Sequence, residues 1–196
     1  ERKGAFYRTY RDAALNDGSV TLANAGPAAV QAVVTVTGNP VEPEPVLSRG
    51  YTVERSYYRL DGSQVQPSGV RQNERLVVVL KVTEAEARQA RVLLVDRLPA
   101  GFEIDNPRLV DSDTVAGLPW LKRDVEPAHV EYRDDRFVAA FDRETDQSAF
   151  FTVAYMVRAV SPGRYVHPAA QVEDMYRPER FGRTGFGSVE VVQARP

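Results

Sequence analysis

The fold is decided by a run of apolar and β-branched residues, Arg75-Leu76-Val77-Val78-Val79-Leu80-Lys81-Val82. Such runs favour β-strands, because branched side chains pack well on a pleated surface. Similar short runs lie on both sides of it, separated by Gly, Pro, Asp and Asn turn signals. We expect strands at residues 19–23, 32–37, 51–58, 75–82, 91–95, 130–132, 137–141, 150–160, 164–172 and 188–192. The pattern predicts an all-β, antiparallel β-sandwich with short helical segments only.

The segments between these runs predict turns and little helix. Asp61-Gly62 is a pair that tight hairpin turns favour. Thr83-Glu84-Ala85-Glu86 resembles a helix capping box, but the next strand follows so soon that one helical turn is the most it can form. Residues 111–126 show no clear period and are predicted to be a long connection with room for a short helix. We expect Trp120, within it, to be a core residue.

A proline-rich stretch marks the best candidate for a domain boundary. It reads Pro40-Val41-Glu42-Pro43-Glu44-Pro45, and its prolines remove backbone donors and favour an extended chain. We therefore predict a lead segment at residues 1–45 and a β-sandwich at residues 46–196.

Composition and charge exclude several classes of protein. The 196 residues carry 25 basic and 27 acidic side chains, a net charge of −2, so we expect no nucleic-acid partner. No apolar run reaches the roughly 18–20 residues that span a bilayer, so we expect no membrane insertion by this chain. Without cysteine it has no disulfide, thiol nucleophile or Cys-based zinc site. Because it begins Glu1-Arg2-Lys3-Gly4, with neither Met nor a signal-peptide pattern, we interpret it as a processed product or a fragment.

The sequence offers no set of residues for catalysis, a metal or a cofactor. His129 and His167 stand alone, without the spacing of metal ligands, and are expected to be structural or solvent-facing. The acidic clusters at residues 111–113 and 142–146 lack oxygen ligands at the later positions of a calcium loop. No serine lies in a Gly-x-Ser-x-Gly motif. We therefore predict that the chain is not an enzyme.

One charged segment, residues 168–181, carries Met175 and Tyr176 side by side and is closed by Pro178. Met is adaptable and Tyr amphipathic, and both are favoured at protein contact surfaces. Two interpretations stay open from composition alone: the pair forms a contact with a partner, or it fills the end of the sandwich.

Several motifs resemble the C-terminal end of bacterial α2-macroglobulins. They are Arg158-Ala159-Val160-Ser161-Pro162-Gly163-Arg164-Tyr165, the stretch Val172–Glu179, Asp96–Pro107, Arg133–Phe137 and Tyr57–Gly62. The resemblance implies that residues 46–196 are the terminal macroglobulin-like β-sandwich called MG10. It also implies that residues 1–45 are the returning part of a CUB domain.

The resemblance further implies a role for the charged segment. Bacterial α2-macroglobulins are periplasmic protease traps, commonly lipid-anchored, in which cleavage of a bait region exposes a reactive thioester that acylates the protease. In the family a Met-Tyr pair, here Met175 and Tyr176, packs over the thioester and shields it from water. The expected partners are the thioester domain and the neighbouring macroglobulin domains of the same parent chain, and target proteases through the parent.

The charged residues around this pair are expected to form the polar rim of that contact: Glu173, Asp174, Arg177 and Glu179. This chain has no cysteine, so a thioester cysteine, where the parent has one, lies elsewhere in it. In family members that have lost this cysteine, the resemblance implies that Met175 and Tyr176 form an interdomain contact with no thioester to shield. Two other functions are compatible with a β-sandwich, namely a free-standing adhesion or ligand-binding module and a small hydrolase.

Overall fold

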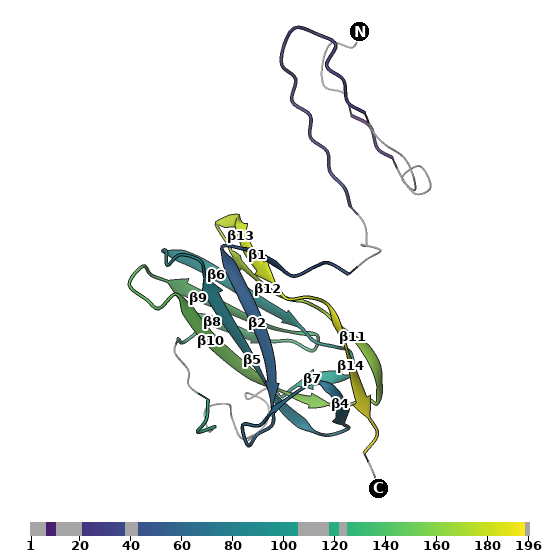
Figure 1. Cartoon of the computed structure of the whole chain (residues 1–196), viewed down its shortest axis with the longest axis vertical. Helices are drawn as coiled ribbons and strands as arrows, with labels where there is room; N and C mark the ends of the chain where they lie inside the picture. The colour runs from purple at the N-terminus through teal and green to yellow at the C-terminus, as the bar shows by residue number, and fades with distance from the viewer. Residues whose placement is uncertain (1–6, 11–20, 38–42, 106–117, 122–124, 195–196) are drawn as a thin grey trace. The chain divides into compact units, whose positions relative to one another are not determined.

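The computed structural model describes residues 7–10, 21–37, 43–105, 118–121 and 125–194. All regular structure in these ranges is β, and they contain no helix, hence none able to cross a membrane. The chain divides into two units, residues 1–39 and 40–196 (Figure 1). The second unit includes the end of the proline-rich stretch, since Arg183 donates hydrogen bonds to the Pro45 carbonyl and the Glu44 carboxylate.

In the first unit the structure confirms a turn but not the strands. The Asn24 side chain holds the turn, since its Nδ2 donates to the Ala28 carbonyl and its Oδ1 accepts from the Gly26 backbone amide. Residues 21–37 form no strand, so the strands predicted at 19–23 and 32–37 are absent there; residues 19 and 20 lie outside the described residues. Val33 and Val36 are 80% and 89% exposed. A strand forms only when its backbone groups pair with a neighbour, and β-branched composition does not supply that neighbour.

The second unit is a sandwich of two antiparallel sheets and a smaller third sheet, which confirms the predicted fold class (Figure 1). The six strands of the first sheet are, in spatial order, β1 (Leu47–Arg49), β13 (Arg177–Arg183), β12 (Ala170–Asp174), β6 (Ala90–Arg97), β9 (Arg136–Arg143) and β8 (His129–Tyr132). The five strands of the second sheet are β3 (Gln64–Val65), β2 (Tyr51–Tyr58), β5 (Arg75–Glu84), β10 (Phe150–Ala159) and β7 (Phe102–Ile104).

The third sheet joins segments that are far apart in the sequence. It contains β11 (Gly163–His167), β14 (Gly187–Val192) and β4 (Ser68–Arg71), with β14 in the centre. β14 pairs antiparallel with β11 and parallel with β4.

The core lies between the two large sheets and follows from the alternation of side chains along their strands. In β6 the side chains of Val92 and Leu94 are fully buried and those between them are not. Aromatic rings from facing strands meet in the middle, where Phe137 of β9 stacks on Tyr155 of β10 with ring centroids 4.4 Å apart. Burial of such side chains contributes about 1.5–3 kcal/mol each, so this core is the main stabilising element of the unit.

Most predicted strands of the sandwich are confirmed. Those at residues 51–58, 75–82, 91–95, 130–132, 137–141, 150–160 and 188–192 are present with bounds shifted by at most two residues. The strand predicted at 164–172 is instead two strands, β11 and β12, interrupted at Pro168, and each joins a different sheet. The predicted turn at Leu60–Ser63 is confirmed, because the Arg59 amide donates to the Ser63 carbonyl.

The helical turn predicted at Thr83–Glu86 is wrong. Thr83 and Glu84 are the last residues of β5, where Thr83 pairs with Phe150 of β10 and Glu84 with Tyr51 of β2. A strand that is hydrogen-bonded on both sides satisfies the backbone groups a helix would use, so tertiary pairing overrides the local capping signal.

Trp120 is not a core residue. The side chain is half-buried and lies against the turn between β2 and β3, where its ring stands 5.1 Å from that of Tyr58 and its Nε1 donates to the Leu60 carbonyl. Gly62 permits this contact, because its φ is +87° and a Cβ there would lie 2.9 Å from the Trp120 ring. Of the predicted 111–126 connection, residues 111–117 and 122–124 lie outside the described residues.

Candidate functional site

Met175 and Tyr176 form the two-residue turn that joins β12 to β13, at one end of the sandwich (Figure 1). Their side chains are 55% and 80% exposed. The interpretation that they fill the end of the sandwich is therefore contradicted. Residues 177–183, which follow the turn, form strand β13, between β12 and β1.

The turn is shaped by the buried carboxylate of Asp174. The Asp174 residue is 1% exposed, and its Oδ1 accepts hydrogen bonds from the backbone amides of Tyr176, at 3.0 Å, and Arg177, at 3.2 Å. An Asp side chain that bonds to the backbone two and three residues ahead favours a turn at that place. The prediction that Asp174 belongs to the exposed rim is therefore wrong, because this carboxylate is used inside the domain.

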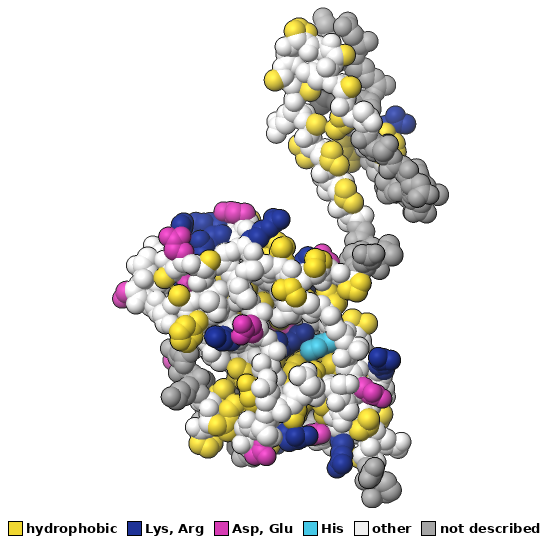
Figure 2. All heavy atoms as spheres, in the orientation of Figure 1, with side chains coloured by type: hydrophobic (Ala, Val, Ile, Leu, Met, Phe, Trp, Pro, Cys, Tyr) yellow, Lys and Arg dark blue, Asp and Glu magenta, His cyan; other side chains and the backbone are white. Residues whose placement is uncertain are grey.

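Two further contacts connect the turn to the neighbouring strand β6 and the loop before it. The Met175 amide donates to the Arg91 carbonyl at 2.8 Å. The Arg177 guanidinium donates from Nη1 to Asp174 Oδ2, at 3.3 Å, and to the Gln89 carbonyl, at 3.2 Å. Glu173, Arg177 and Glu179 are exposed. Figure 2 shows basic and acidic side chains side by side at this end of the sandwich.

A bulge in β13 follows the turn. Asp174 pairs with Arg177 but Glu173 pairs with Phe181, so residues 178–180 have no register partner in β12. Pro178, which has no amide hydrogen, fits such a bulge. The bulge turns Arg180 toward β2, where its guanidinium lies 5.3 Å from the ring centroid of Tyr51, whose pKa is raised by burial.

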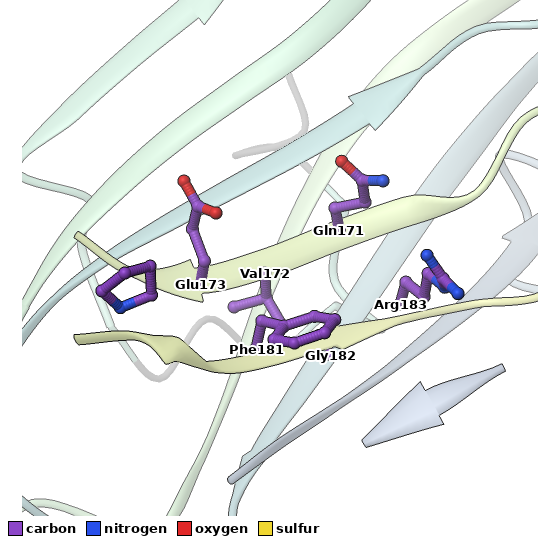
Figure 3. A pocket seen from close by; sticks show the side chains of 7 residues that line it. Gln171, Val172, Glu173, Phe181, Gly182 and Arg183 are labelled. Atoms are coloured by element: carbon purple, nitrogen blue, oxygen red, sulfur yellow. The ribbon is translucent and has the colours of Figure 1, made fainter. Parts of the chain in front are cut away.

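A shallow hollow of about 250 Å³ lies beside the bulge on β12 and β13. Figure 3 shows that the side chains of Gln171 and Glu173 project from the same side of β12, with Phe181 and Arg183 on β13 beside them. Arg49 of β1 lies over the Phe181 ring at 5.6 Å. The lining mixes charged, amide and aromatic groups, with Glu173 on β12 and Arg183 on β13.

The two histidines have different surroundings. His129 is exposed and has Nε2 3.3 Å from a carboxylate oxygen of Glu131. His167 is buried and shares a 2.7 Å hydrogen bond with the Tyr57 hydroxyl. Burial, with a smaller effect from the Arg55 charge, lowers the pKa of His167 to about 3. Among the described residues no three His, Asp or Glu side chains group as metal ligands.

A buried ionic network beside His167 was not predicted from the sequence. The Arg55 guanidinium pairs with Asp96 and donates to the Pro168 carbonyl, and the Tyr155 hydroxyl donates to Asp96. Burial raises the pKa of Asp96, against the opposing effect of Arg55. The network crosses the core from β2 to β6 and β10, so its role is to connect the two sheets.

The fold is a macroglobulin-like β-sandwich with an exposed turn at one end. A family model described as the bacterial α2-macroglobulin MG10 domain matches residues 50–179, a range that includes Met175 and Tyr176. The chain belongs to the bacterial α2-macroglobulin family.

Relatives and solved structures agree with this assignment. The α2-macroglobulin of Xylella fastidiosa strain 9a5c is 38% identical over 150 residues, which cover 72% of this chain and 9% of that protein. The Escherichia coli K12 α2-macroglobulin is 34% identical over 135 residues, which cover 65% of this chain and 8% of that protein. This chain therefore spans about a tenth of the length of these relatives.

Among solved structures, Escherichia coli α2-macroglobulin activated by porcine elastase has a TM-score of 0.69 and 31% identity, covering 81% of this chain and 14% of that one. Salmonella α2-macroglobulin reacted with methylamine has a TM-score of 0.65 and 32% identity, and the match covers 78% of this chain and 10% of that one.

Proposed function

We propose that residues 46–196 are a non-catalytic terminal domain that packs on the thioester domain of its parent chain. In this proposal Met175 and Tyr176 cover the thioester, or the equivalent site, until a protease cuts the bait region. The observation that carries the proposal is a Met-Tyr turn that is exposed yet held by Asp174, in a chain of this family. A large exposed aromatic ring gains free energy when a partner domain buries it.

The chemistry of the site fits a shielding role. A thioester is an activated acyl group, so a thioether and a ring that exclude water slow its hydrolysis. Met175 and Tyr176 are the apolar centre of the end surface, and Glu173, Arg177 and Glu179 supply exposed polar groups around them. This division into an apolar centre and a polar rim is typical of protein interfaces.

We extend the proposal to the parent protein. It is a protease trap of the periplasm, attached to the membrane by a lipid group outside this chain. Support comes from the relative whose structure was determined after activation by elastase and from the relative that was reacted with methylamine. Residues 1–45 are, in the same proposal, the returning part of a CUB domain.

In the parent protein, Tyr176→Ala should speed the reaction of the thioester with methylamine by roughly 10- to 150-fold. This range corresponds to the loss of about 1.5–3 kcal/mol of ring burial. The rate is measured by methylamine incorporation followed by mass spectrometry. The matched control is Phe186→Ala, which removes an exposed aromatic ring beyond the opposite end of β13 and should react like the wild type. A wild-type rate in Tyr176→Ala would contradict the proposal.

The 196-residue chain alone should inhibit no protease, because the proposal places the bait region and the thioester in other parts of the parent. Residual activity of trypsin or elastase, measured at equimolar and tenfold excess of the chain, should equal that of the protease alone. Stoichiometric inhibition would show that the chain has an inhibitory surface of its own.

A further inference from the structure

The backbone of the Met175-Tyr176 turn is held at three consecutive amides. The amide of Met175 donates to the Arg91 carbonyl, and the amides of Tyr176 and Arg177 donate to Asp174 Oδ1. Both acceptors, the Arg91 carbonyl and the Asp174 carboxylate, belong to this domain. The side chains of Met175 and Tyr176 are thus exposed, while the backbone that carries them is hydrogen-bonded within the domain.

Asp174 is the centre of this arrangement. Its buried carboxylate uses one oxygen for the two turn amides and the other for the Arg177 guanidinium. Arg177 in turn donates to the Gln89 carbonyl, so it links the carboxylate to the loop before β6. The desolvation cost of burying this carboxylate is offset within the domain by the two amides and the guanidinium that donate to it. The result is a turn held in one conformation before any partner binds, which reduces the entropy lost on binding.

Three arginines near the turn are paired within the domain. Arg88 pairs with Glu86, Arg91 with Asp142, and Arg177 with Asp174. The turn therefore offers its apolar side chains to a partner, and the charges of these three arginines are compensated within the domain.

We propose that Asp174 and Arg177 are positioning residues that hold the turn in one conformation, so that Met175 and Tyr176 enter a preformed apolar pocket on the neighbouring domain of the parent chain. The inference rests on the proposed shielding function and adds to it the residues that prepare the turn for docking. A flexible turn would have to be ordered at the moment of contact, and the entropy lost would weaken the contact.

The test uses the full-length parent protein and two measurements. Hydrogen exchange of the peptide containing residues 175–177 reports whether the turn is held. The rate of nitration of Tyr176 by tetranitromethane, read by mass spectrometry, reports whether the ring is covered, and it requires no thioester. The variants are Asp174→Ala, Asp174→Asn and Arg177→Met. The matched control is Arg91→Met, which removes an arginine of similar exposure, 42% against 47% for Arg177, and keeps the Arg91 carbonyl.

In the wild-type parent we expect slow nitration of Tyr176. Asp174→Ala should speed both exchange at 175–177 and nitration of Tyr176 by about tenfold or more, because two amides lose a buried acceptor. Arg177→Met should speed both by about two- to fivefold. Asp174→Asn keeps an oxygen acceptor for the amides, so its exchange and nitration rates should lie between those of Arg177→Met and the wild type. The rates of Arg91→Met should match those of the wild type.

Faster exchange with unchanged, slow nitration in Asp174→Ala would overturn the positioning role and leave the shielding function standing. Nitration of the wild-type parent as fast as that of the isolated chain would instead overturn the shielding function, and the positioning role with it. If Asp174→Ala does not fold, Arg177→Met decides, because its side chain is half exposed and outside the core. Wild-type exchange and nitration in Arg177→Met would overturn the proposal.

Discussion

Replacing Arg143 by Met should lower the free energy of unfolding of the sandwich by about 3–5 kcal/mol. The Arg143 side chain is 0% exposed, and its Nε donates to the buried Glu84 carboxylate at 2.7 Å. Its remaining donors bond to Gln147 Oε1 and the Ser148 carbonyl, which closes the connection between β9 and β10. Methionine fills much of the same volume but leaves the Glu84 charge buried without its partner, and this uncompensated charge is the main cost.

The comparison that isolates this cost is the double variant Arg143→Met with Glu84→Leu. Removing both charges should recover a large part of the loss, because the desolvation penalty disappears together with the attraction. Arg158→Met, at an exposed arginine 3.7 Å from Glu103, is the control and should change stability by less than about 0.5 kcal/mol. Urea denaturation measures all four proteins. A single Arg143→Met variant as stable as the control would contradict the expectation.

The second large effect is a dependence of stability on pH that comes from His167. Its pKa is about 3 in the folded protein and 6.5 in an unfolded chain, because burial beside Arg55 disfavours the charged imidazole. Between these values the unfolded chain binds a proton that the folded protein does not. Stability from this group is therefore complete above pH 6.5 and falls as the pH is lowered, by about 1.4 kcal/mol per unit, until the folded pKa is reached.

His167→Gln separates this effect from the titration of the carboxylates, which both proteins share. The stability advantage of the wild type over His167→Gln should fall by about 2 kcal/mol between pH 7.5 and pH 5.0. His129→Gln, which removes the exposed imidazole, should keep the pH dependence of the wild type. Urea denaturation at several pH values measures the free energy of unfolding of each protein. A constant difference between the wild type and His167→Gln would show that the buried imidazole does not resist protonation.

The core strands could be predicted from the sequence because their signal is local. The β-branched run at residues 75–82 gives β5, and the Asp61-Gly62 pair gives the turn after β2. β13 could not be predicted in this way. Its residues, with Arg177, Pro178 and Glu179 at the start, have low strand propensity, and it is a strand because β12 and β1 pair with it on either side.

The buried positions of Arg55 and Asp96 could be predicted from the alternation of side chains along their strands, but not from composition. In β2, Arg55 has the same parity as Val53 and Tyr57, which face the core. Asp96 likewise follows Val92 and Leu94 at intervals of two in β6. A charged residue at a core-facing position of a strand predicts a buried ion pair, but the identity of its partner depends on the packing of two sheets and is not local.

For the candidate site, the pair Met175 and Tyr176 could be singled out from the sequence, and its exposure could not. Exposure depends on where β12 ends and on the bulge in β13, which are properties of the register between two strands. The same register places Asp174 beneath the turn, so a residue that looks like part of a charged surface segment is buried.

The central place of β14 in the third sheet has a consequence for folding and for truncated chains. Every strand of the two large sheets lies before residue 184, so a chain truncated after Arg183 keeps all of them. The third sheet, in contrast, depends on β14, because β4 and β11 each pair with it. β4 ends at Arg71, whereas β14 begins only at Gly187. A parallel pair between segments so far apart in the sequence closes slowly. We therefore expect the pairing of β14 to be a late step of folding, and a chain truncated before Gly187 to leave the edges of β4 and β11 open to pairing with other chains.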